Sequence, residues 1–149
     1  MRHDHLFHNY QDDRDPNNGR AISSAGDLAA LLDRMRGGHP IMAEFTGPGD
    51  FEIVIGIGGE LGCIQCSRMD GNPPYLMAVS HNPPMKRGYI EFQCDGTPTP
   101  VGSTNILTFD EMKSVVLHFF DTGERSDRVN WRPVRPGDVK EDAERRLDS

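Results

Sequence analysis

Residues 50–68, DFEIVIGIGGELGCIQCSR, constrain the fold of this chain more than any other stretch. Apolar side chains take every second position of its first half: Phe51, Ile53, Ile55 and Ile57. That spacing is typical of a β-strand with one face against a core. Gly58-Gly59 favours a tight turn, because glycine tolerates positive φ, and residues 61–68 then form the returning strand. We therefore predict a β-hairpin at the centre of an antiparallel sheet.

Two other segments have the apolar spacing of amphipathic helices. The first follows an N-cap at Ser23-Ser24, ends at Gly37-Gly38 and carries an i, i+3, i+4, i+7 stripe: Leu28, Leu31, Leu32 and Met35. The second begins with a capping box of Thr108 and Glu111, ends at Gly123 and carries a longer stripe: Met112, Val115, Val116, Phe119 and Phe120. Both helices are expected to cover the sheet.

The remaining predicted strands are residues 40–45, 75–79, 88–94, 97–101 and 129–134. In residues 88–94 one face carries Ile90, Phe92 and Cys94 and the other Tyr89, Glu91 and Gln93, and the pattern leaves open which of them is buried. Prolines at 98 and 100 favour an edge position for the next strand. Strands grouped between two helices indicate an α+β fold, with an antiparallel sheet of about five to seven strands and two helices packed on it.

The chain of 149 residues is long enough for one domain with a real core. We expect residues 1–19 to be a mobile N-terminal segment in which Leu6, Phe7 and Tyr10 have the alternative of docking as an edge strand. Residues 20–135 are the expected α+β domain, and residues 136–149 an acidic, disordered tail.

The sequence offers no credible catalytic, cofactor or metal site. Cys63 and Cys66 form a C-x-x-C, but an offset of three within a strand points the two thiols to opposite faces. The glycines at 56, 58 and 62 are followed by a strand instead of the helix that a dinucleotide loop requires. We expect no enzymatic activity, no cofactor and no metal. The few cysteines, an odd number, and the absence of an apolar signal core or membrane span favour the cytoplasm.

Acidic residues predominate in the predicted sheet region. Between residues 41 and 122 there are ten acidic against four basic residues, a net charge of −6. Such a domain should repel nucleic acid and attract basic partners. Six acidic residues lie on predicted strands or turns, with three aromatic residues nearby in sequence: Asp50, Glu52, Glu60, Asp70, Glu91 and Asp95, with Tyr75, Tyr89 and Trp131. A solvated acidic face with Trp131 covering the core and a protein-binding surface both explain this pattern.

The order of these elements resembles that of an immunity protein of bacterial polymorphic toxin systems. Residues 20–134 carry the resemblance, most specifically in the strand-turn FEIVIGIGGELGCIQC, the strand GYIEFQC and the ending ILTFDEMKSVVLHFFDTGERSDRVNW. In that ending Phe119-Phe120, Thr122-Gly123, Val129 and Trp131 are the distinctive positions. The chain is similar to the first-numbered immunity family, whose members are often encoded beside deaminase-type toxins.

The resemblance implies a non-enzymatic inhibitor that binds a cognate toxin domain and blocks its active site. The implied toxin is a basic nucleic-acid (cytosine) deaminase, with no nucleic acid or membrane as partner of this chain. The residues expected to contact the toxin are Glu52, Glu60, Asp70, Tyr75, Tyr89, Glu91 and Asp95. Two alternatives remain: an immunity protein for a nuclease toxin, and a small α+β ligand-binding or enzyme domain with a cleft of converging polar groups.

Overall fold

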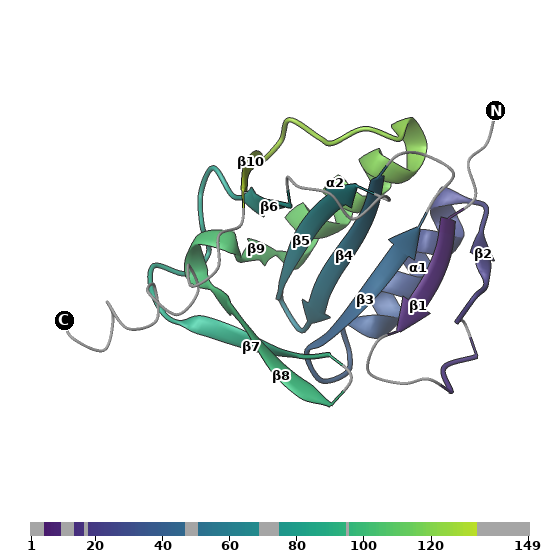
Figure 1. The fold of residues 1–149 in the computed structure, drawn as a ribbon, viewed down its shortest axis with the longest axis horizontal. Coiled ribbons are helices and arrows are strands. Elements are labelled where there is room, and N and C mark those ends of the chain that lie inside the picture. Colours follow the sequence, from purple (N-terminus) through teal and green to yellow (C-terminus); the bar gives the residue numbers. More distant parts are fainter. Residues whose placement is uncertain are drawn as a thin grey trace.

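The computed structural model describes residues 5–9, 14–16, 18–46, 51–68, 75–94 and 96–133. Its main sheet runs in the order β10-β6-β5-β4-β3-β1-β2, with every neighbouring pair antiparallel. These strands are β1 (His5–Asn9), β2 (Ala21–Ile22), β3 (Ile41–Thr46), β4 (Phe51–Gly58), β5 (Leu61–Arg68), β6 (Leu76–Val79) and β10 (Asn130–Pro133). The predicted hairpin, β4–β5, is therefore central, as Figure 1 shows.

Three more strands join the sheet away from this path. β7 (Tyr89–Cys94) and β8 (Thr97–Gly102) form an antiparallel hairpin, and β9 (Leu107–Thr108) pairs with the start of β5 after a 3-10 turn, η1 (Ser103–Asn105). A single parallel pair, Ile41 with Gln93, joins β7 to β3. The sheet thus has ten strands in the described residues, more than the predicted five to seven. Strands of two residues, such as β2 and β9, are too short to produce a readable alternation.

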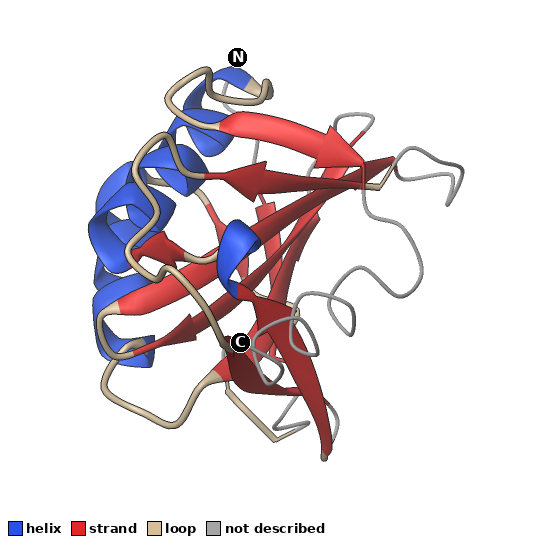
Figure 2. Ribbon diagram, turned by 90° about the vertical axis from the view of Figure 1, so that its left-hand side faces the viewer, coloured by secondary structure: helices blue, strands red, loops and turns tan. Residues whose placement is uncertain are grey.

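Both predicted helices form, and their N-caps are the predicted residues. The first helix ends at Met35 with Arg36 as its C-cap, just before the predicted Gly37-Gly38. Ser24 Oγ accepts from the Asp27 N–H at the start of α1 (Ala25–Met35), and Thr108 Oγ1 accepts from the Glu111 N–H at the start of α2 (Phe109–Thr122). Gly123 ends α2 with a φ of 74°, the left-handed conformation that glycine adopts without strain. Figure 2 shows that α1 and α2 lie on the same face of the sheet.

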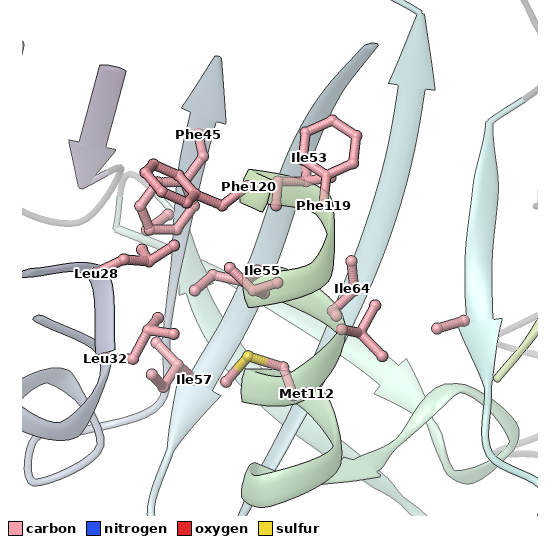
Figure 3. Packing of buried hydrophobic residues seen from close by; sticks show 14 of the residues in the cluster. Leu28, Leu32, Phe45, Ile53, Ile55, Ile57, Ile64, Met112, Phe119 and Phe120 are labelled. Atoms are coloured by element: carbon pink, nitrogen blue, oxygen red, sulfur yellow. The ribbon is translucent and has the colours of Figure 1, made fainter. Parts of the chain in front are cut away.

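The main core lies between these helices and the sheet. Ile53, Ile55 and Ile57 of β4 are at most 2% exposed, and they meet Leu28 and Leu32 of α1 and the apolar stripe of α2 (Figure 3). Trp131 of β10 packs at the border of this cluster, and its Nε1–H donates to the Ser126 carbonyl over 2.8 Å. Burial of this apolar surface is the main stabilising contribution to the fold.

A second, smaller core lies on the opposite face of the sheet, under the β7–β8 hairpin. Its buried members are Cys63, Met77, Phe92, Val101 and Ile106. A Cβ added at Gly56 of β4 would lie 2.8 Å from the Phe92 ring and 2.7 Å from Cys63 Sγ. Glycine at this position therefore makes room for Phe92, and the hairpin is seated on the sheet through that ring.

The alternation in β7 is now resolved. Phe92 is fully buried and Ile90 is half-buried, whereas Tyr89 and Glu91 on the other face of the strand are exposed. The two prolines of β8 lie at the edge of the sheet, since β8 pairs only with β7. Residues 5–9, within the segment expected to be mobile, form β1, which pairs with β3 and β2.

Replacing Gly56 with alanine should displace the Phe92 ring from its packed position against β4. We expect Gly56→Ala to lower the free energy of unfolding by about 1–3 kcal/mol, the usual cost of overpacking a core. Urea denaturation of both proteins measures the difference.

Gly26→Ala is the matched control, because nothing lies within 4 Å of a Cβ added there in α1. Alanine is the better helix former, so this change should be neutral or slightly stabilising. Equal stabilities for the two variants would contradict the seating of Phe92 on Gly56.

Candidate functional site

The face of the sheet away from the helices carries mostly polar side chains of β1, β3, β4 and β5. Strand register places these residues on it: His8, Glu44, Thr46, Glu52, Val54 and Gln65. We call this set the open sheet face. The described helices α1 and α2 both lie on the other side of the sheet (Figure 2). The β7–β8 hairpin packs over Gly56 on the same side of the sheet as the open sheet face, further along the strands.

Two carboxylates lie close together on the open sheet face. Glu52 is opposite Thr46, and Glu44 is opposite Val54, so the two glutamates are diagonal neighbours on adjacent strands. Burial raises the pKa of Glu44, the charge of Glu52 raises it further, and His8, directly opposite on β1, acts in the other direction. The folded chain thus holds an ionised carboxylate at Glu44 at some energetic cost.

The outer side of the β7–β8 hairpin forms a second exposed surface. It consists of Tyr89, Glu91 and Gln93 on β7 and the residues opposite them on β8, Gly102, Pro100 and Pro98. We call this set the hairpin surface. Tyr89 is 45% exposed, one of three exposed large hydrophobic residues in the described part of the chain with Tyr75 and Leu6. Exposed aromatic side chains beside polar ones are typical of protein interaction sites.

The predicted contact residues do not gather at one place. Glu52 lies on the open sheet face, whereas Tyr89 and Glu91 lie on the hairpin surface. Tyr75, 41% exposed, immediately precedes β6. Of the remaining three, Glu60 lies in the turn between β4 and β5, whereas Asp70 and Asp95 lie outside the described residues, as does Asp50.

Glu60 takes part in a contact that joins both helices to the central hairpin. The Arg36 guanidinium, after the end of α1, donates from Nη2 to Glu60 Oε1 over 2.6 Å and from Nε to the Gly59 carbonyl over 3.2 Å. Its Cζ lies 3.9 Å from the centroid of the Phe109 ring at the start of α2. We call this arrangement the Arg36 clamp. The Glu60 side chain is nonetheless 87% exposed.

Sequence reasoning overlooked Glu44 and His8. Alternation in the strand IMAEFT sets Glu44 against Ala43 and Phe45, so the face of Glu44 was readable from the sequence. Its neighbours were not, because they depend on the register of the β3–β4 hairpin and on the pairing of β1 with β3.

The cysteines lie as their spacing predicts. Cys66 belongs to the main core and Cys63 to the second core, on opposite faces of the sheet, and neither forms a disulfide. Burial raises the pKa of the Cys63 thiol to about 12, with a backbone hydrogen bond at Gly56 acting against the shift. Burial likewise raises the pKa of Cys66 to about 11, against the charge of Arg125. Such thiols are poor nucleophiles at neutral pH.

A pocket of about 620 Å³ lies at the connection between α2 and β10. Residues 123–127 and 129–131 line the pocket, and none of them is a predicted contact residue. The groups with raised pKa, Glu44, Cys63 and Cys66, all lie elsewhere. Within the described ranges no three His, Cys, Asp or Glu side chains gather as a metal ion would require. In the same ranges neither helix has the length and apolarity to cross a membrane.

The family model described as Immunity protein Imm1 matches residues 17–133. The match spans every described element except β1 and includes both helices, the central hairpin and the hairpin surface. No curated protein matches the chain.

The charge on Glu44 gives a test of the open sheet face. Because folding raises this pKa above its usual value of 4.5, ionised Glu44 opposes folding at neutral pH, and that cost disappears below pH 4.5, where the group is protonated in both states. We expect Glu44→Gln to raise the free energy of unfolding at pH 7, with a smaller gain at pH 4, in urea denaturation. The gain at pH 7 should shrink in a Glu52→Gln background, since Glu52 contributes to the shift. An identical gain at both pH values would contradict this account.

The buried thiols give a second test. Native protein treated with iodoacetamide at pH 8 should be alkylated at Cys94 alone, which is half-buried, because Cys63 and Cys66 are protonated and enclosed. Mass spectrometry counts the modified sites, and the same treatment in guanidinium chloride should modify all three. Rapid native labelling of Cys63 would show that the β7–β8 hairpin does not stay seated.

Proposed function

The chain belongs to the Imm1 family of immunity proteins, and from this membership we propose that it binds a cognate bacterial toxin domain and neutralises it by covering the active site. The match over residues 17–133 is the observation that carries the proposal. An inhibitor of this kind performs no reaction of its own. It inhibits by binding tightly to the toxin surface, and such binding needs exposed anchor residues and charges on a rigid scaffold.

We propose a nucleic-acid deaminase, acting on cytosine, as the toxin. A toxin domain that binds DNA or RNA needs a basic groove, and acidic side chains on a rival protein can occupy that groove in place of phosphates. The net charge of −6 over residues 41–122 suits such a partner. A nuclease toxin has the same requirement, so charge alone does not separate a deaminase from a nuclease. Sequencing the genomes of cells exposed to the active toxin does separate them.

The open sheet face and the hairpin surface are the two proposed contact areas. Glu52 with Glu44 supplies negative charge on the first, and Tyr89 with Glu91 an aromatic anchor and a charge on the second. Docking a cation beside Glu44 and Glu52 would relieve the repulsion that the free protein tolerates. Tyr75 remains proposed as a further anchor, Glu60 as a rim charge beside the Arg36 clamp, and Asp70 and Asp95 as additional acidic contacts.

Co-expression tests the function. Bacteria producing the toxin domain encoded beside the gene for this chain should survive only when this chain is present in their cytoplasm, and the two proteins should co-purify. Genome sequencing of cells in which the toxin is briefly active should show C-to-T changes. Strand cleavage without base changes would replace the deaminase with a nuclease. A wild-type chain that neither binds nor protects would contradict the immunity function.

Charge reversal then tests the acidic surface. Glu52→Lys should slow association with the toxin domain by about tenfold at low salt and by less at high salt, because steering by exposed charges is screened. Asp121→Lys is the matched control, since Asp121 is exposed on α2, on the opposite side of the sheet. Equal slowing by both variants would indicate a general effect of net charge and contradict a role for the open sheet face.

A further inference from the structure

Tyr89 and Glu91 present an aromatic ring and a carboxylate on the same side of one strand. They are two residues apart on β7, which separates their Cα atoms by about 7 Å. Their cross-strand neighbours, Gly102 and Pro100, carry no charge. A single planar cation lying over the Tyr89 ring can therefore reach the Glu91 carboxylate as well.

Glu91 is not neutralised by a basic residue of the described part of the chain. Among the residues that the structure describes, no basic side chain forms an ion pair with it. The nearest basic residues in sequence, Lys86 and Arg87, are exposed in the loop before β7. The hairpin surface thus holds two of the three components of an aromatic–cation–carboxylate contact.

The Arg36 clamp shows the complete form of that contact in the same molecule. There an arginine lies 3.9 Å from the centroid of an aromatic ring and donates to a carboxylate over 2.6 Å. Lys113, the other cation near Phe109, lies 5.8 Å from the ring centroid and pairs with Asp33 instead. The difference fits the planar guanidinium, which stacks on a ring while its N–H groups reach a carboxylate.

We propose that the hairpin surface is a receptor for one arginine side chain of the toxin domain, bound between the Tyr89 ring and the Glu91 carboxylate. This inference rests on the proposed function and names the partner group at one part of that interface. An arginine suits a nucleic-acid-binding groove, where guanidinium groups contact phosphates. The same arginine would then be withdrawn from its substrate, which joins anchoring to inhibition.

Side-chain docking is favoured over strand addition at this edge. Pro98 and Pro100 of β8 lack the N–H groups that an added strand would need. Phe92, seated on Gly56, fixes the inner side of the hairpin, so Tyr89 and Glu91 are presented from a rigid element. Preorganisation of this kind reduces the entropic cost of binding.

Titration calorimetry with the co-expressed toxin domain tests the receptor. We expect Tyr89→Ala and Glu91→Gln each to weaken binding by about 10- to 100-fold, as loss of an interface anchor does. Tyr89→Phe keeps the ring and should stay within about threefold of wild type. Asp121→Asn, at an exposed position of α2, should leave the affinity for the toxin domain unchanged. If the Tyr89→Ala and Glu91→Gln variants both bind the toxin domain as tightly as the wild type does, the arginine receptor is overturned and the immunity function is left intact. If Tyr89→Phe weakens binding as much as Tyr89→Ala does, stacking of the arginine on the ring is overturned.

A second measurement does not depend on the toxin. The isolated chain is titrated by NMR with the peptide Gly-Gly-Arg-Gly-Gly, and separately with Gly-Gly-Lys-Gly-Gly, at millimolar concentrations. The arginine peptide should shift the Tyr89 ring signals saturably and more than the lysine peptide, and Glu91→Gln should reduce the shift. Unchanged Tyr89 signals, or equal shifts from both peptides, would overturn the inference whether or not the toxin binds.

Discussion

The structure depends on the burial of one central hairpin from both sides. On one face of β4 the isoleucines are buried beneath α1 and α2, and on the other face Gly56 leaves a gap that the Phe92 ring fills. Interiors pack as densely as organic crystals, so neither contact tolerates much adjustment. The two helices and the β7–β8 hairpin are positioned by this single element.

That arrangement decides which side chains remain for a partner. With the helices on one face and the second core at one end of the other, the open sheet face keeps its carboxylates and the outer side of β7 keeps Tyr89 and Glu91. An immunity protein needs exposed charged and aromatic side chains of this kind on a rigid scaffold. The Arg36 clamp serves the same purpose, because it ties the end of α1, the β4–β5 turn and the start of α2 together.

Local elements were predictable because their causes lie within a few residues. Alternation in β4, the caps at Ser24 and Thr108, and the glycine at 123 each act over one turn or strand, and each is confirmed. The opposite placement of Cys63 and Cys66 followed from strand geometry alone. The candidate site was only partly accessible: Tyr89 and Glu91 were identified from their strand, whereas Glu44 was missed because its neighbours come from other strands.

The sequence by itself therefore determined the α+β class, the central hairpin and both helices, because periodicity, capping and turn residues act at short range. The family followed from the sequence too, through its match to a family model over residues 17–133. Only the tertiary structure decided that Glu44 lies beside Glu52, that Arg36 pairs with Glu60, and that Tyr89 instead of Phe92 faces outward. The first depends on the register between two consecutive strands, and the other two depend on contact between segments distant in the chain. Strand register and dense packing fix such contacts, and neither can be predicted from a single short segment of the sequence.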